Sequence, residues 1–176
     1  MATAAASPAP ARSRALSAAG LGLLLLVALF YLLGAASDLA AVAGHNLPTD
    51  HRGTFAKLTG TSFSHLQAAA PGQASYISLL ERGYALHELT FALLFIVVLA
   101  IPFRRRQRWS WWAAWLPMIA NLGYSLTFGL HDPAILARSL IADIALPVLL
   151  LAHIPAFFAR PRSAAPDAPA AHQLGR

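Results

Sequence analysis

Four predominantly apolar stretches, each long enough to cross a lipid bilayer, constrain this chain more than any other feature of its sequence. They cover residues 15–36, 84–103, 109–130 and 134–158. A helix rises about 1.5 Å per residue and the hydrocarbon core of a bilayer is about 30 Å thick, so about 20 apolar residues suffice for one crossing. The sequence therefore predicts an all-α fold, in which a four-helix transmembrane bundle occupies residues 15–160.

The composition points to the same surroundings. Charged residues make up 11% of the chain and hydrophobic residues 57%, whereas soluble domains usually contain about 25% charged residues. Such a chain has too little polar surface to cover a water-soluble body, so we expect the lipid bilayer to be its main partner. No cysteine is present, which excludes disulfides, thiol redox chemistry and cysteine-ligated metals.

The net charge of +6 is the one feature that would favour a nucleic-acid partner. The arginines, however, flank the apolar stretches, where membrane helices end. We therefore expect no nucleic-acid partner.

The segments outside the apolar stretches are of two kinds. Residues 1–14 and 161–176 are rich in alanine and proline, and we expect them to be disordered cytoplasmic tails. Residues 37–83 contain charged residues throughout, so we expect this long segment to lie outside the lipid and to be partly helical. One alternative concerns the first apolar stretch, 15–36, whose basic start and small residues at its end are also typical of a cleaved signal peptide.

An amphipathic pattern occurs within the long segment. Phe55, Leu58, Ser62 and Leu66 fall on one helical face, which predicts a short helix resting on the bundle or on the membrane surface. A Pro-Gly pair at position 71 is expected to end the segment.

Basic residues indicate the orientation. The turn after the second apolar stretch contains four arginines, Arg104, Arg105, Arg106 and Arg108, whereas residues 37–83 contain only three basic residues in 47. Because basic flanks stay in the cytoplasm, we expect both termini inside and the 37–83 segment outside.

Asp143 is the most unusual polar residue within the apolar stretches. Burying an unpaired carboxylate in hydrocarbon costs at least about 2.5–3.5 kcal/mol on insertion scales. Asp143 is therefore expected to face the bundle interior, where Asn121, at a similar depth of about 13 Å, or Tyr124 is its expected neighbour. Either Asp143 accepts a proton or a ligand in an outward-facing cavity, or it makes a structural hydrogen bond between helices.

A second polar group lies at the outer entrance of the second apolar stretch. Glu81, Tyr84 and Glu88 follow one another at helical spacing and His87 lies next to them. The candidate ligand-binding residues are thus Asp143, Asn121, Tyr124, Glu88 and His87. The histidines are scattered without a zinc-binding spacing, so we predict no metal site and no cofactor.

Two motifs carry a resemblance. The sequence Arg-Arg-Arg-Gln-Arg-Trp-Ser-Trp-Trp at 104–112, with Leu-Thr-Gly-Thr-Ser-Phe at 58–63, resembles small bacterial four-helix membrane proteins of unknown function. The layout is also similar to the DoxX-type membrane proteins, without a specific shared site. The resemblance implies a multi-pass protein of the bacterial inner membrane and transfers no catalytic residue.

The sequence contains no phosphate-binding loop, dinucleotide fingerprint or nucleophile elbow, so the catalytic residues are unknown and an enzyme is not the favoured interpretation. We expect the protein to bind a small apolar or lipid-like ligand or a membrane protein partner, which includes a second copy of itself. The alternative is a membrane enzyme or proton-coupled transporter with a polar cavity around Asp143.

Overall fold

The computed structural model describes the backbone of residues 9–159 and the side chains of residues 18–159, and no strand occurs within this part of the chain. Residues 1–8 and 160–176, most of the predicted tails, lie outside the described residues. Residues 9–14 were also predicted to be disordered, but they form the first turns of helix α1 (Ala9–Ala43). Alanine has the highest helix propensity, and a proline is tolerated in the first turn of a helix, so this composition does not prevent a helix.

Three helical segments are long and apolar enough to cross a membrane: Ala18–Ala43, Pro71–Phe103 and Pro133–Phe158. The first belongs to α1. The second consists of α4 (Pro71–Val98) and the π-helical turn η1 (Leu99–Phe103), and the third of α7 (Pro133–Ala152) and α8 (Ile154–Phe158).

Large apolar side chains cover the outer faces of these helices. Leu26, Leu94 and Ile144 are each more than half exposed. An apolar surface of this extent is stable in lipid and prone to aggregate in water, which agrees with insertion in a membrane.

The remaining apolar stretch, 109–130, does not form one long helix. It is divided into α5 (Arg108–Ala113), α6 (Leu116–Tyr124) and the π-helical turn η2 (Ser125–Gly129). The break falls directly before Pro117, which lies in the first turn of α6. A proline inside a helix clashes with the preceding turn, so the helix ends and restarts there. Within residues 9–159 the long apolar helices therefore number three, one fewer than the sequence predicted.

The segment predicted as residues 37–83 is shorter in the structure, because α1 continues to Ala43 and α4 already begins at Pro71. Between them lie α2 (Thr49–Thr59) and α3 (Phe63–Ala69). The single amphipathic helix expected over 55–66 is thus wrong. Gly60 ends α2 with a φ of 69°, a left-handed conformation that favours glycine, and the hydroxyl of Ser62 accepts a hydrogen bond from the His65 N–H at the start of α3.

A small apolar cluster still joins these elements. It contains buried side chains from the loop before α2, from α3 and from α4, namely Leu47, Phe63 and Ala74, with Phe55 and Leu66 packed against them. Leu58, which was expected on the same face, is 62% exposed. The break expected at Pro71 is confirmed: α3 ends at Ala69, and Pro71 occupies the first turn of α4.

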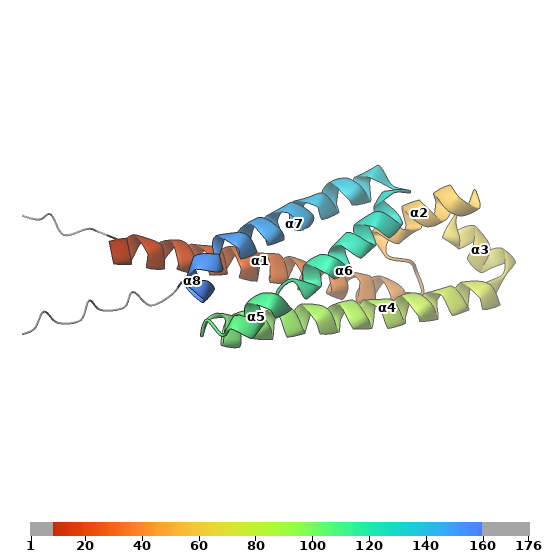
Figure 1. Cartoon of the computed structure of the whole chain (residues 1–176). Coiled ribbons are helices and arrows are strands. Elements are labelled where there is room, and N and C mark those ends of the chain that lie inside the picture. Colours follow the sequence, from red (N-terminus) through yellow and green to blue (C-terminus); the bar gives the residue numbers. More distant parts are fainter. Residues whose placement is uncertain (1–8, 160–176) are drawn as a thin grey trace, which may run out of the picture.

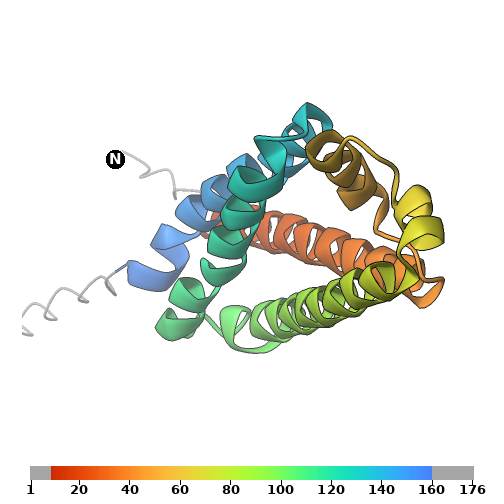
Figure 2. The same ribbon diagram turned by 90° about the vertical axis from the view of Figure 1, so that its right-hand side faces the viewer.

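The helices are arranged so that α2 and α3 lie at one end of the bundle and α5 and α8 at the other (Figure 1). The start of α1 and the end of α8 lie at the α5 end. Seen from the opposite end, α2 lies beside η2, and α3 lies beside the start of α4 (Figure 2).

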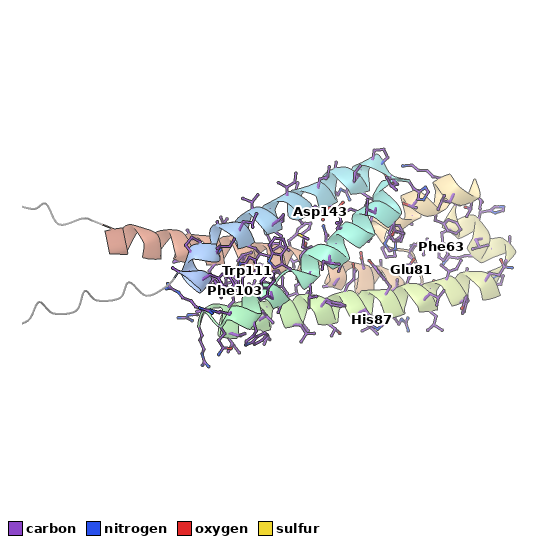
Figure 3. All side chains as sticks on the ribbon, in the orientation of Figure 1. Phe63, Glu81, His87, Phe103, Trp111 and Asp143 are labelled. Atoms are coloured by element: carbon purple, nitrogen blue, oxygen red, sulfur yellow. The ribbon has the colours of Figure 1, made fainter. Side chains whose placement is uncertain are left out.

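The main apolar core fills the α5 half of the bundle, where Phe103 and Trp111 are labelled in Figure 3. The side chains of Leu24, Leu99, Leu146 and Leu150 are fully buried there. The indole Nε1 of Trp111 donates a hydrogen bond of 2.8 Å to the carbonyl of Leu150. Close packing therefore occupies one half of the molecule, and the polar residues gather in the other.

Candidate functional site

A cavity of about 680 Å³ lies among α1, α2, α4, α6, η2 and α7, toward the α2 end of the bundle. Its volume is within the range of about 300–1,000 Å³ that is usual for small-ligand sites. The walls are mainly apolar, with the side chains of Phe30, Ala35, Phe91, Ala92 and Ile135. The cavity is only partly enclosed by the protein.

Three carboxyl groups line this cavity: Asp38 from α1, Asp50 from α2 and Glu88 from α4. Asp38 and Glu88 are partly buried neighbours, and the Tyr84 hydroxyl lies beside Glu88. Within residues 18–159, neither Asp38 nor Glu88 forms an ion pair with a lysine or an arginine. Two neighbouring carboxyl groups repel each other when both are ionised, so this pair favours a bound proton or a bound cation.

The short helix α2 covers this end of the cavity, and Asp50 and His51 hold it there. The Tyr124 hydroxyl on α6 donates a hydrogen bond of 2.6 Å to Asp50 Oδ2. Nδ1 of His51 lies 2.8 Å from Glu81 Oε2 on α4. The His51 ring also stacks on Phe128 of η2, with ring centroids 4.5 Å apart and planes only 2° from parallel. Contacts with three separate elements therefore fix the position of α2.

His51 is 3% exposed, and its surroundings act on its charge in opposite directions. Burial disfavours the protonated ring, whereas the hydrogen bond that the ring donates to Glu81 and the charges of Glu81, Asp50 and Asp38 favour it. Together they raise the pKa of His51 above its usual value. A protonated ring paired with Glu81 is thus the favoured state of this contact.

A further contact joins α2 to the start of α7. Lys57 Nζ lies 3.1 Å from Asp132 Oδ1, and Asp132 accepts a hydrogen bond from the Ala134 N–H that caps α7. The hydrogen bonds from Lys57 and from the Ala134 backbone lower the pKa of Asp132. Because Lys57 is half exposed, this ion pair contributes little to stability. The close approach of α2 depends on Gly53, where an added Cβ would lie 2.8 Å from Asp132 Oδ2.

Asp143 is held by two neighbours from the broken helix. The Asn121 amide donates a hydrogen bond of 2.7 Å to Oδ1, which is the contact expected from their shared depth. The Ser125 hydroxyl lies 2.6 Å from Oδ2 and donates to it. Both carboxylate oxygens therefore accept hydrogen bonds from α6 and η2, and Asp143 joins these elements to α7.

The structure brings together four of the five candidate residues predicted from the sequence. Asn121, Tyr124, Glu88 and His87 line the cavity. Asp143 is not among the described residues that line it but lies behind Asn121, toward the middle of α7 (Figure 3). The cavity thus has its acidic groups at Asp38, Asp50 and Glu88, and is not built around Asp143.

Sequence reasoning missed Asp38, Asp50 and His51 as members of this site. They lie in the segment that was assigned to the outside, and Asp50 meets Tyr124 across 74 residues of chain. The sequence did contain one indication for Asp38. The apolar residues Leu39 to Val42 follow it directly, which predicts that the first helix extends beyond residue 36 and includes Asp38, as α1 does.

No group of three histidine or acidic side chains suited to a metal ion occurs among the described residues. No protein-family model, curated protein or solved structure matches the chain. The likeness to DoxX-type membrane proteins therefore stays a prediction.

Proposed function

We propose that this chain is a four-span membrane protein that binds a small apolar or lipid-like ligand in the cavity beneath α2. The fourth crossing would be made by α5, α6 and η2 in series. Together they cover residues 108–129, about 33 Å at helical rise, which is close to the thickness of the hydrocarbon layer. They run from one end of the bundle to the other alongside α7 (Figure 1).

The cavity is the observation that carries this proposal. Its mainly apolar walls, with polar groups from α1, α2, α4 and α6, are typical of a site for a molecule with an apolar body and one polar end. A closed structural core would instead be filled by its own side chains, as the α5 half of this bundle is.

The arginine turn supports an outward-facing cavity. Arg104, Arg105, Arg106 and Arg108 lie between η1 and the start of α5, at the end of the bundle opposite to α2. If these residues stay in the cytoplasm of a bacterial cell, the cavity opens toward the periplasmic half of the inner membrane.

Two features favour binding over transport or catalysis. The α5 half of the bundle is packed by fully buried leucines, Leu24, Leu99, Leu146 and Leu150, so the cavity does not continue through the molecule there. Asp143, around which the transporter or enzyme alternative was predicted, has both oxygens engaged by Asn121 and Ser125.

The test uses a neutral long-chain alcohol that carries a photoreactive diazirine, added to the protein in lipid nanodiscs. Saturable labelling, defined as labelling that excess unlabelled alcohol removes, is mapped by mass spectrometry. We expect it on the cavity segments of α1 and α4, around Phe30 and Phe91.

Two glycines of α1 give a matched pair of variants. Gly34 lines the cavity and Gly22 does not, and an added Cβ meets no heavy atom within 4 Å at either position. Gly34→Trp should fill the cavity and abolish saturable labelling, whereas Gly22→Trp should leave it unchanged. Equal labelling of both variants would contradict the proposal.

A further inference from the structure

We infer that the cavity selects an organic cation, a molecule with an apolar body and a positively charged head that sits between Asp38 and Glu88. This inference rests on the proposed function and adds the chemical class of the ligand. It follows from the charges, the aromatic rings and the shape that the described residues give to the cavity.

The charged groups that line the cavity are mainly acidic. Three carboxyl groups, Asp38, Asp50 and Glu88, line the cavity, against one arginine, Arg138. Arg138 is exposed, and its charge also acts on Asp132 outside the cavity. Asp50 is already engaged by Tyr124. Asp38 and Glu88 form no ion pair within residues 18–159, although the charge of His51, which is paired with Glu81, also acts on both. An acidic head or a phosphate would be repelled here, and a cation would be attracted.

The rings around the acidic pair favour an organic cation in particular. Tyr84, Tyr124 and Phe128 all line the cavity near its acidic end. The His51 ring already stacks on one face of Phe128, and its centroid lies 5.7 Å from that of Tyr84 and 5.9 Å from that of Tyr124, so a ligand would meet the remaining ring faces. Aromatic faces attract ammonium-type cations through their negative quadrupole, most strongly where water is excluded.

The size of the cavity argues against a bare metal ion. A volume of about 680 Å³ with mainly apolar walls would leave such an ion without ligands on most sides. The same walls bury the apolar body of an organic cation.

The test compares two ions of almost the same shape and opposite charge, tetraphenylphosphonium and tetraphenylborate. Binding to the protein in nanodiscs is measured by equilibrium dialysis and corrected with protein-free nanodiscs. We expect saturable binding of the phosphonium, its loss in Gly34→Trp and its retention in Gly22→Trp. The borate should show no saturable binding.

Asp38→Asn removes one charge of the pair and should weaken phosphonium binding about tenfold or more. Asp132→Asn makes the same chemical change outside the cavity and should leave the affinity within about twofold. Glu88→Gln removes the other charge of the pair and should weaken phosphonium binding in the same way. Because Glu88 lies on α4, this variant shows whether a weaker affinity of Asp38→Asn comes from the lost charge or from a local distortion of α1.

The outcomes separate the two proposals. If Gly34→Trp abolishes alcohol labelling but phosphonium and borate bind alike, or if neither Asp38→Asn nor Glu88→Gln weakens phosphonium binding, the cation inference is overturned and the proposed function stands. If Gly34→Trp changes neither alcohol labelling nor phosphonium binding, both proposals are overturned.

Discussion

Nδ1 of His51 on α2 lies 2.8 Å from Oε2 of Glu81 on α4, although 30 residues separate them along the chain. His51 is buried and its ring is stacked on Phe128, so the contact is shielded from water on one face. The helix that covers the cavity is thus attached to the bundle by a pair of ionisable groups, and we expect its attachment to depend on pH.

The sign of that dependence follows from the pKa of His51. Although burial opposes protonation, Glu81 and its acidic neighbours raise this pKa above the usual value of 6.5. A group with a raised pKa in the folded state stabilises that state fully below its unfolded pKa, and the stabilisation is lost as the pH rises through the folded pKa. The melting temperature, followed by circular dichroism in detergent, should fall as the pH rises above 6.5, the usual value of this pKa, by about 2–4 °C per kcal/mol lost.

His51→Gln should reduce this fall, because glutamine keeps a hydrogen bond to Glu81 without a charge that titrates. Glu81→Gln should reduce it as well, and the two changes together should have little further effect, since they remove the same interaction. A pH dependence that both variants retain in full would contradict this assignment.

Asp143 is expected to have a structural role. In Asp143→Asn the new amide still accepts a hydrogen bond from Asn121, and Ser125 retains the Asn121 carbonyl, 2.9 Å away, as a partner for its proton. The free energy of unfolding should therefore change by no more than about 0.6 kcal/mol, an average for such bonds in membranes.

Asp143→Leu should be more costly. It removes the acceptor of the 2.7 Å hydrogen bond from the Asn121 amide, while Ser125 keeps the Asn121 carbonyl as a partner, and this should destabilise the protein by about 1–3 kcal/mol. Both variants should retain saturable alcohol labelling, because Asp143 lies behind the cavity wall. Loss of labelling in a folded Asp143→Asn protein would contradict this role and would favour the alternative of a ligand site centred on Asp143.

The orientation can be tested directly, because the chain contains no cysteine that would react in the background. Gln107→Cys, within the arginine turn, should not react with a membrane-impermeant maleimide added to intact cells. Thr61→Cys, between α2 and α3, should react readily. The reverse pattern would place the cavity on the cytoplasmic side.

The junction between η2 and α7 should be sensitive to a single methyl group. A Cβ on Gly129 would lie 3.1 Å from the backbone Cα of Leu136, which cannot move as a side chain can. Gly129→Ala should therefore destabilise the protein by about 1–3 kcal/mol in denaturant or thermal unfolding.

Gly123 is the matched control for that change, six residues earlier, where an added Cβ meets nothing within 4 Å. Gly123→Ala in α6 should be neutral or should stabilise the helix by up to about 1 kcal/mol. Equal effects of the two changes would show that the tight approach of η2 and α7 does not limit stability.

The sequence predicted well the properties that depend on residues close together in the chain. Charge-free runs such as Ala15 to Ala36 marked the helical regions, because helices long enough to cross a bilayer satisfy their own backbone and need only apolar side chains. The same reasoning misjudged one end, because α1 runs on to Ala43. A sum of hydropathies does not register a helix that continues past an acidic residue.

The sequence by itself thus determined that the chain is helical and strongly apolar, and that Asn121 and Asp143 lie at similar depths on two different helices. Only the tertiary structure decided that Asp38 and Glu88 are neighbours, that α2 covers the cavity through Asp50 and His51, and that Asp143 lies behind the wall. The physical reason is that depth along a helix follows from counting residues. Which faces meet is set by how the helices rotate and pack, and this depends on contacts between distant parts of the chain.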